Sequence, residues 1–241
     1  MIDAKLYLDD TNRFLWEMMN QSFHITIDYS PEDCYANYLQ NGNCIIYVPK
    51  MKEPDSASFT HELLHLYLPH HNIYIGGAVK GMLKDTYPLN NIFDNGLYDH
   101  VSNSLEHIKM LPLYLKMGYP IDKFLLDYND KKLTDDDVDI LYNTYKKGMF
   151  YPNYNHLAIN CYIGKFFAVK ADINTDNHYD RQMALLDKLD HGLFSSLNNF
   201  WNGWIDYNIE LKREVWDNDY HELVVVFVND LVVWSKHKKI A

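Results

Sequence analysis

The stretch SFTHELLHLYLPHHN, residues 58–72, constrains the fold of this chain more than any other segment. It carries His61 and His65 four residues apart, with Glu62 directly after the first histidine. On an α-helix, side chains four residues apart lie on the same face, one turn above each other. Both imidazoles can therefore reach a single metal ion. The sequence predicts that this segment is a helix with a metal site on one face.

Signals for the start and end of a helix surround the motif. Asp55 and Ser56 are typical of a helix start, and Pro69 is typical of a helix end. Three apolar residues in between share a second face that can be buried: Phe59, Leu63 and Leu66. We therefore expect a helix from about residue 56 that stops at Pro69.

Zinc is the metal that this pair of ligands favours. Two neutral imidazoles leave room in a tetrahedral site for a third protein ligand and a water molecule. Glu62 would lie beside the pair, where its carboxylate can accept a proton from that water as a general base. Iron, cobalt and manganese accept similar ligands, so zinc is an inference from ligand type.

The first half of the chain combines helices with a few strands. Apolar doublets predict an opening amphipathic helix over 3–20, and the alternation in 23–29 predicts a strand with one buried face. Asn41-Gly42 offers the positive-φ pair of a tight hairpin turn, and the segment CIIYV after it is expected to be a second strand. The motif helix follows these strands.

The rest of the chain is expected to be mostly helical. Helical spacing continues on both sides of Pro112, which predicts a helix over 99–120 that ends or kinks at the proline. Thr134 is expected to cap a helix whose first turn is acidic. Further helices are expected over 155–169 and 181–205, and over 221–236 despite its β-branched residues. The fold class that follows is α+β, mostly helical.

The HELLH motif and the elements before it resemble the zincin metallopeptidases. The resemblance covers about the first 115 residues and implies a zincin-like core of a helix, a small antiparallel sheet, the motif helix and a ligand helix. On this basis we expect a catalytic core over 1–120 and a helical C-terminal region over 121–241, packed on the core as one compact unit. In that family a strand edge binds an extended peptide, and 43–50 would be its counterpart here.

A catalytic zinc needs a third protein ligand, and one candidate lies within the motif region. His71 follows His61 by ten residues, which is the spacing of the metzincin pattern. That pattern has glycine where this chain has Leu68, and a leucine in the left-handed conformation costs about 1–2 kcal/mol. We therefore rank His71 below the candidates farther along the chain.

The second source of a third ligand is the helix expected after residue 99. Asp99, Asn103 and His107 are four apart and share a face that can lie opposite the two motif histidines. This pattern resembles the ImmA/IrrE-type metallopeptidases, with Asp99 in the place of a glutamate. Asp99 or His107 is expected to bind the metal, and Glu106 is a third choice.

Charge and composition exclude several other classes of protein. The net charge is −11 and the lysines and arginines form no long cluster, so we expect no nucleic-acid partner. No apolar run approaches the roughly 20 residues of a membrane helix, and the start of the chain lacks the features of a secretion signal. Three widely spaced cysteines suit a reducing compartment, so we expect a cytoplasmic protein that does not bind membranes.

The expected function is that of a zinc metallopeptidase that hydrolyses peptide bonds in a peptide or protein substrate. In this hypothesis His61, His65 and either Asp99 or His107 bind Zn²⁺, and Glu62 is the general base. The alternative is a regulatory or binding module that uses a zincin fold without proteolysis, its metal structural or absent. The substrate sequence and the oligomeric state stay open.

Overall fold

The computed structural model describes residues 2–148, 152–210 and 219–241. The chain is α+β and mostly helical, as expected, with two small three-stranded sheets. Its contacts divide it into two units, Met1–Ile73 with Ile108–Tyr128, and Tyr74–His107 with Asn129–Ala241. Helix α6 (Asn95–Lys116) contributes residues to both units, and the expected division into 1–120 and 121–241 stays a prediction.

The sheet of the first unit contains β1 (His24–Tyr29), β2 (Ala36–Gln40) and β3 (Asn43–Val48), in the order β1-β3-β2. β2 and β3 are antiparallel and pair from Gln40 opposite Asn43. The turn between them has φ +50° at Asn41 and +77° at Gly42. The predicted hairpin is therefore confirmed, including the left-handed conformation that this residue pair favours.

The expected antiparallel sheet is wrong for β1, which pairs with β3 in parallel. β1 and β2 lie on opposite sides of β3, so residues 30–35 must carry the chain past the end of the central strand. Alternation along β1 predicts a strand with a buried face, but it carries no information about which strand lies beside it. The parallel neighbour is set by packing with distant residues.

This strand order also overturns the expected peptide-binding edge. β3 includes most of the segment 43–50, and both of its backbone edges pair with neighbouring strands. An extended peptide cannot add to a strand whose hydrogen-bonding edges are both occupied. On the side of β3 away from β1, β2 is the edge strand of this sheet.

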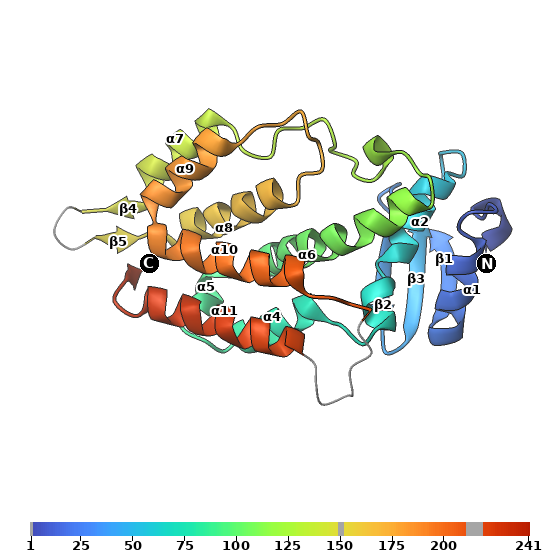
Figure 1. Ribbon diagram of the computed structural model, residues 1–241, viewed down its shortest axis with the longest axis horizontal. Helices are drawn as coiled ribbons and strands as arrows, with labels where there is room; N and C mark the ends of the chain where they lie inside the picture. Colours follow the sequence, from blue (N-terminus) through green and yellow to red (C-terminus); the bar gives the residue numbers. More distant parts are fainter. Residues whose placement is uncertain (1, 149–151, 211–218) are drawn as a thin grey trace. The chain divides into compact units, whose positions relative to one another are not determined.

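Two helices pack on this sheet, α1 (Arg13–Ser22) and α2 (Ser56–Leu64), and they contact each other (Figure 1). On β3 every second side chain is buried, namely Cys44, Ile46 and Val48. The expected opening helix begins at residue 13 instead of residue 3, and a short 3-10 turn, η1 (Ala4–Leu6), precedes it. The buried face of the sheet and the apolar faces of the two helices thus form one apolar core.

The motif helix α2 starts as predicted but ends earlier. The side chain of Asp55 accepts a hydrogen bond from the Ala57 amide and caps the helix. The helix ends at Leu64, and a separate turn, α3 (Tyr67–His70), contains Pro69. The expected stop at Pro69 is therefore wrong. A proline in the first turn of a helix is tolerated because those backbone amides have no acceptor within the helix.

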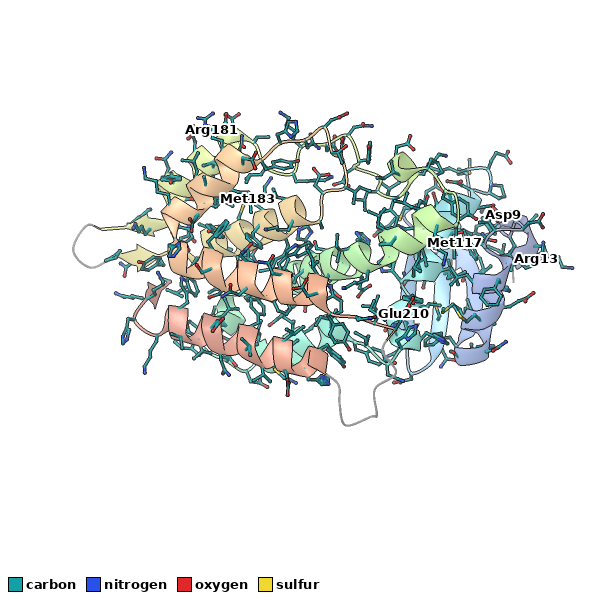
Figure 2. The ribbon with its side chains drawn as sticks, in the orientation of Figure 1. Asp9, Arg13, Met117, Arg181, Met183 and Glu210 are labelled. Atoms are coloured by element: carbon teal, nitrogen blue, oxygen red, sulfur yellow. The ribbon has the colours of Figure 1, made fainter. Side chains whose placement is uncertain are left out.

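Buried polar contacts hold α2 against the segment before α1. Asn12 is fully buried, and its amide group donates to Thr60 Oγ1 at 2.9 Å and to the Tyr7 carbonyl at 3.0 Å. Tyr119 donates to both carboxylate oxygens of Asp9, at 3.0 and 2.9 Å. Figure 2 shows Asp9 on the loop that leads into α1. The buried bond between Asn12 and Thr60 therefore ties the motif helix to the segment before α1.

Helix α6 runs through Pro112 and does not end there. It stops after Lys116, and Gly118 follows with φ +84°. A glycine in the left-handed conformation just after the last turn is a common helix terminator, whereas one proline removes a single backbone hydrogen bond. Of the two expected outcomes at Pro112, an end or a kink, the end is therefore wrong, and a helix over this segment is confirmed. After it, η2 (Ile121–Lys123) completes the elements of the first unit.

The second unit is built from helices, as expected. Its helices besides the first part of α6 are α4 (Ile75–Leu83), α5 (Leu89–Ile92), α7 (Asp135–Thr144), α8 (His156–Lys170), α9 (Asp180–Leu189), α10 (His191–Asp206) and α11 (Asp219–Ser235). The cap at Thr134 is confirmed as a reciprocal capping box with Asp137. The segment expected over 181–205 is divided at Asp190 into two helices.

A second sheet joins three two-residue strands, β4 (Lys146–Lys147), β5 (Asn153–Tyr154) and β6 (Lys239–Ile240). The sequence did not indicate it, because two residues are too short to show alternation. The buried carboxylate of Asp190 secures this end of the unit by accepting hydrogen bonds from Tyr145 at 3.0 Å and Lys238 at 2.9 Å. None of the described helices combines the length and apolar character that crossing a bilayer requires.

Candidate metal centre

Three histidines come together around one point. One ligand nitrogen each of His61, His65 and His107 lies within 4.8 Å of the other two. His107 lies on α6 directly before Ile108, where the helix enters the unit that contains the motif helix α2. The arrangement could hold a metal ion.

The spacing of the two motif histidines matches that of two ligands on one metal ion. Their Nε2 atoms are 3.2 Å apart, and their rings meet at 73°. Two nitrogens bound to zinc at about 2.0–2.1 Å with a tetrahedral angle lie about 3.3 Å from each other. His65 directly follows the last residue of α2 but keeps a helical backbone with φ −60°. The prediction that both rings share a face of the motif helix is therefore met in this geometry.

The other candidates on α6 lie outside the three-histidine group. Asp99 and Asn103 are exposed. Asp99 precedes His107 by eight residues, which is about 12 Å along a helix axis. Glu106 accepts a hydrogen bond from Ser102 at 2.8 Å. The structure therefore brings His107 to the motif pair, and it places Asp99 more than two turns away along the helix.

His71, the candidate suggested by the metzincin spacing, also lies outside the group. Its ring packs against Tyr67, with ring centroids 4.7 Å apart, and against His70 at 5.3 Å. His70 in turn is hydrogen-bonded to Ser22, with 2.7 Å between the ring nitrogen and the hydroxyl. His70 and His71, at the end of α3, therefore contact Ser22, Tyr67 and each other.

Glu62 is buried beside the histidines, with 9% of its surface exposed. Its Oε2 accepts a hydrogen bond of 3.0 Å from the side-chain amide of Asn37. Burial raises the pKa of Glu62, while the charge of His65 and the bond from Asn37 act in the opposite direction. A carboxylate whose affinity for protons is increased by burial suits a general base.

Asn37 is a polar partner of Glu62 that sequence analysis missed. It lies on β2 opposite Ile46 of β3, and because cross-strand partners share a face of the sheet, its side chain faces the same buried side as Ile46. That side is the one on which α2 packs. Asparagine is uncommon within strands. Its presence inside the segment YANYLQ was therefore the sequence feature that could have indicated a functional role for Asn37.

The surroundings of His61 are apolar on one side. Phe124, which is 2% exposed, packs edge-on against the His61 ring with centroids 4.7 Å apart. Burial, together with a smaller contribution from the neighbouring His65, lowers the pKa of His61 to about 3. His61 is therefore neutral at pH 7, which is the form of imidazole that binds a metal ion.

The depressed pKa of His61 predicts how the stability of the metal-free protein depends on pH. In the unfolded chain this histidine takes up a proton near pH 6.5, whereas in the folded protein it stays neutral down to about pH 3. The free energy of unfolding should therefore fall as the pH drops below about 6.5. One such group contributes at most about 1.4 kcal/mol per pH unit.

Chemical denaturation of the metal-free protein at several pH values between 7 and 4 measures this slope. His61→Gln removes the titrating group but keeps a polar side chain, so its slope over the same range should be shallower. Equal slopes for the two proteins would show that His61 is protonated in the folded state as readily as in the unfolded chain.

Comparison of the chain with protein-family models, with curated proteins and with solved structures finds no match.

Proposed function

We propose that this protein is a zinc-dependent metallopeptidase, with His61, His65 and His107 as ligands and Glu62 as general base. The observation that carries the proposal is the convergence of three imidazole nitrogens within 4.8 Å of one another next to a buried carboxylate. Three histidines and an open fourth position are a known ligand set for catalytic zinc. The proposal takes His107 in preference to Asp99 because only His107 belongs to the converging group.

The residues present fit a zinc ion in both type and spacing. All three donors are imidazoles, and the distance of 3.2 Å between the Nε2 atoms of His61 and His65 is close to that of two ligands on one tetrahedral ion. When bound, zinc would supply a Lewis acid that polarises the substrate carbonyl and makes a water molecule more acidic. The remaining chemistry falls to residues of the chain.

Glu62 is the residue that moves the proton. Its carboxylate follows His61 directly on the motif helix and is held by Asn37. It accepts a proton from the attacking water and delivers it to the amine that leaves when the peptide bond breaks. No covalent intermediate on the enzyme is required, which agrees with the high pKa of about 12 that burial imposes on the thiol of Cys44.

The arrangement around the motif supports a zincin-like core and a peptide substrate. The order of α1, a three-stranded sheet, the motif helix α2 and the ligand helix α6 follows that of the family. β2 is an edge strand, and Asn37 on it bonds to Glu62. An extended peptide that adds to β2 would run past the catalytic carboxylate, with its backbone hydrogen-bonded to the strand.

Hydrolysis of an unfolded protein substrate tests this function. We expect cleavage by the zinc-loaded protein, loss of cleavage on treatment with a chelator and recovery when zinc is added back. Bound zinc together with no cleavage of peptides or unfolded proteins would contradict the proposal. That result would support the alternative, a regulatory or binding module with a structural metal.

Replacement of Asn37 tests how the general base is positioned. Asn37→Ala removes the hydrogen bond that holds Glu62 Oε2, so we expect kcat to fall by about 10–100-fold, the loss usual when a supporting partner in a metal site is removed. Zinc content should not change, because Asn37 binds no metal in this proposal. Peptide hydrolysis and metal analysis on the same sample give both values.

Asn43→Ala provides the matched control. Asn43 is exposed on the neighbouring strand, and its side chain contacts the Asn41 carbonyl. Its replacement should leave kcat near that of the unmodified protein. If Asn37→Ala keeps full kcat, the contact with Glu62 has no part in catalysis.

A further inference from the structure

Helix α11 has two faces of different exposure. One face is buried against α10 and α4 within the second unit (Figure 1) and includes Val224, Phe227 and Leu231. The opposite face is apolar as well, although it is exposed. Its valines are Val225 with 43% of its surface exposed, Val226 with 57%, Val232 with 38% and Val233 with 71%. Exposed apolar side chains gathered on one helix face in this way mark an interaction surface.

The residues of this exposed strip are arranged symmetrically about Asn229. Val226 and Val225 lie three and four residues before it, and Val232 and Val233 lie three and four residues after it. These spacings place all four valines on the face that carries Asn229. Seven residues before Asn229 is Glu222, and seven residues after it is Lys236, both exposed. The valines are therefore at equal spacings on both sides of Asn229. The two ends differ in charge, because one carries Glu222 and the other carries Lys236.

A surface with this symmetry is complementary to itself. When two copies of α11 lie antiparallel with Asn229 next to Asn229, the valine pair at each end meets the opposite valine pair of the second copy. Glu222 then lies opposite Lys236 of the second copy at both ends. A parallel arrangement would instead place like charges together, which is unfavourable. An interface of two identical patches related by a two-fold axis has this property.

We propose that the protein forms a dimer in which α11 packs antiparallel against α11 of a second copy, with the two-fold axis at Asn229. The charge pattern selects a second copy as the occupant, because one strip supplies both the acidic and the basic partner. The proposal is independent of the metal centre and of the peptidase activity.

The surroundings of α11 extend this surface at its C-terminal end. Val232, Val233 and Lys236 line a cavity of about 620 Å³ together with Tyr87, which is 74% exposed. Lys239 also lines this cavity, so the end that receives Glu222 of the second copy is basic and partly apolar. Fourteen residues of helix span about 21 Å. This length provides less contact than the roughly 800 Å² per partner of a standard stable complex, so the dimer should depend on protein concentration.

Sedimentation of the full chain over a range of concentrations tests the proposal. The mass should rise from 28.6 kDa for one chain towards about 57 kDa as concentration increases through the micromolar range. Val226→Asp places a charge among the exposed valines and should shift the transition to at least about tenfold higher concentration. A chain that stays at 28.6 kDa throughout would overturn the proposal and leave this face to a different partner.

Charge exchange tests the antiparallel register itself. Glu222→Lys or Lys236→Glu alone places like charges together at both ends, so each should weaken the dimer. The two changes combined restore opposite charges at both ends and should recover the original dissociation constant. Lys188→Glu, an equal change of charge at an exposed position on α9, is the control and should leave the dimer unchanged. A dimer that either single variant leaves intact, or that the double variant does not restore, would refute this register.

Discussion

Replacement of Glu62 by glutamine is expected to lower kcat for peptide hydrolysis by about 10²–10⁴-fold, the usual contribution of a general base. Glutamine has nearly the same shape and can still accept a hydrogen bond from Asn37 through its carbonyl oxygen. It cannot take a proton from water. Zinc content should therefore stay equal to that of the unmodified protein while turnover is lost.

Steady-state hydrolysis and metal analysis of Glu62→Gln provide the two measurements. Glu106→Gln is the matched control, because Glu106 bonds to Ser102 and lies outside the three-histidine group. Its kcat should change little. If Glu62→Gln hydrolyses peptides at the original rate, a different group must accept the proton, and the proposed mechanism is wrong.

Replacement of His107 by alanine is the second change with a large expected effect. It removes one of three imidazoles that would hold the metal ion, so the affinity for zinc should fall by more than the roughly 10–100-fold that loss of an outer hydrogen-bond partner causes. Peptide hydrolysis should be lost with the metal. Competition for zinc with a chromophoric chelator measures the affinity directly.

Asp99→Ala is the comparison that decides between the two candidates on α6. Asp99 is exposed and more than two helical turns from His107, so its removal should leave the affinity for zinc unchanged. His65→Ala, which removes a motif histidine, should resemble His107→Ala. The opposite pattern, with zinc lost in Asp99→Ala and retained in His107→Ala, would assign the third ligand to the carboxylate.

Features that depend on neighbouring residues in the sequence were predicted well. The Asn41-Gly42 hairpin, the Asp55 start of the motif helix and the Thr134 cap each follow from local backbone chemistry. The helix at the end of the chain was also predicted, because its polar residues recur at helical spacing although its valines favour strands. The four-residue spacing of His61 and His65 likewise predicted that their rings lie close together, and their Nε2 atoms are 3.2 Å apart.

Features that depend on distant residues were not predicted. The parallel pairing of β1 with β3 depends on how residues 30–35 cross the sheet. Pro69 lies in the first turn of α3, where a backbone amide would have no acceptor within the helix. Pro112 lies inside α6, where it removes a single backbone hydrogen bond.

Two parts of the site also depend on tertiary structure. Asp99 and His107 share a helix face, and only the packing of α6 decides which of them reaches the motif. Asn37 lies 25 residues before Glu62 and reaches it only because β2 pairs in register with β3.

If three imidazoles hold one zinc ion, X-ray absorption at the zinc edge of the purified protein should detect them. We expect one bound zinc with three histidine nitrogens at about 2.0–2.1 Å and one light-atom ligand from solvent. The His107→Ala variant should lose one of these nitrogens or the ion itself. Absence of zinc, or a site with only two histidines and a protein carboxylate, would refute the three-histidine site.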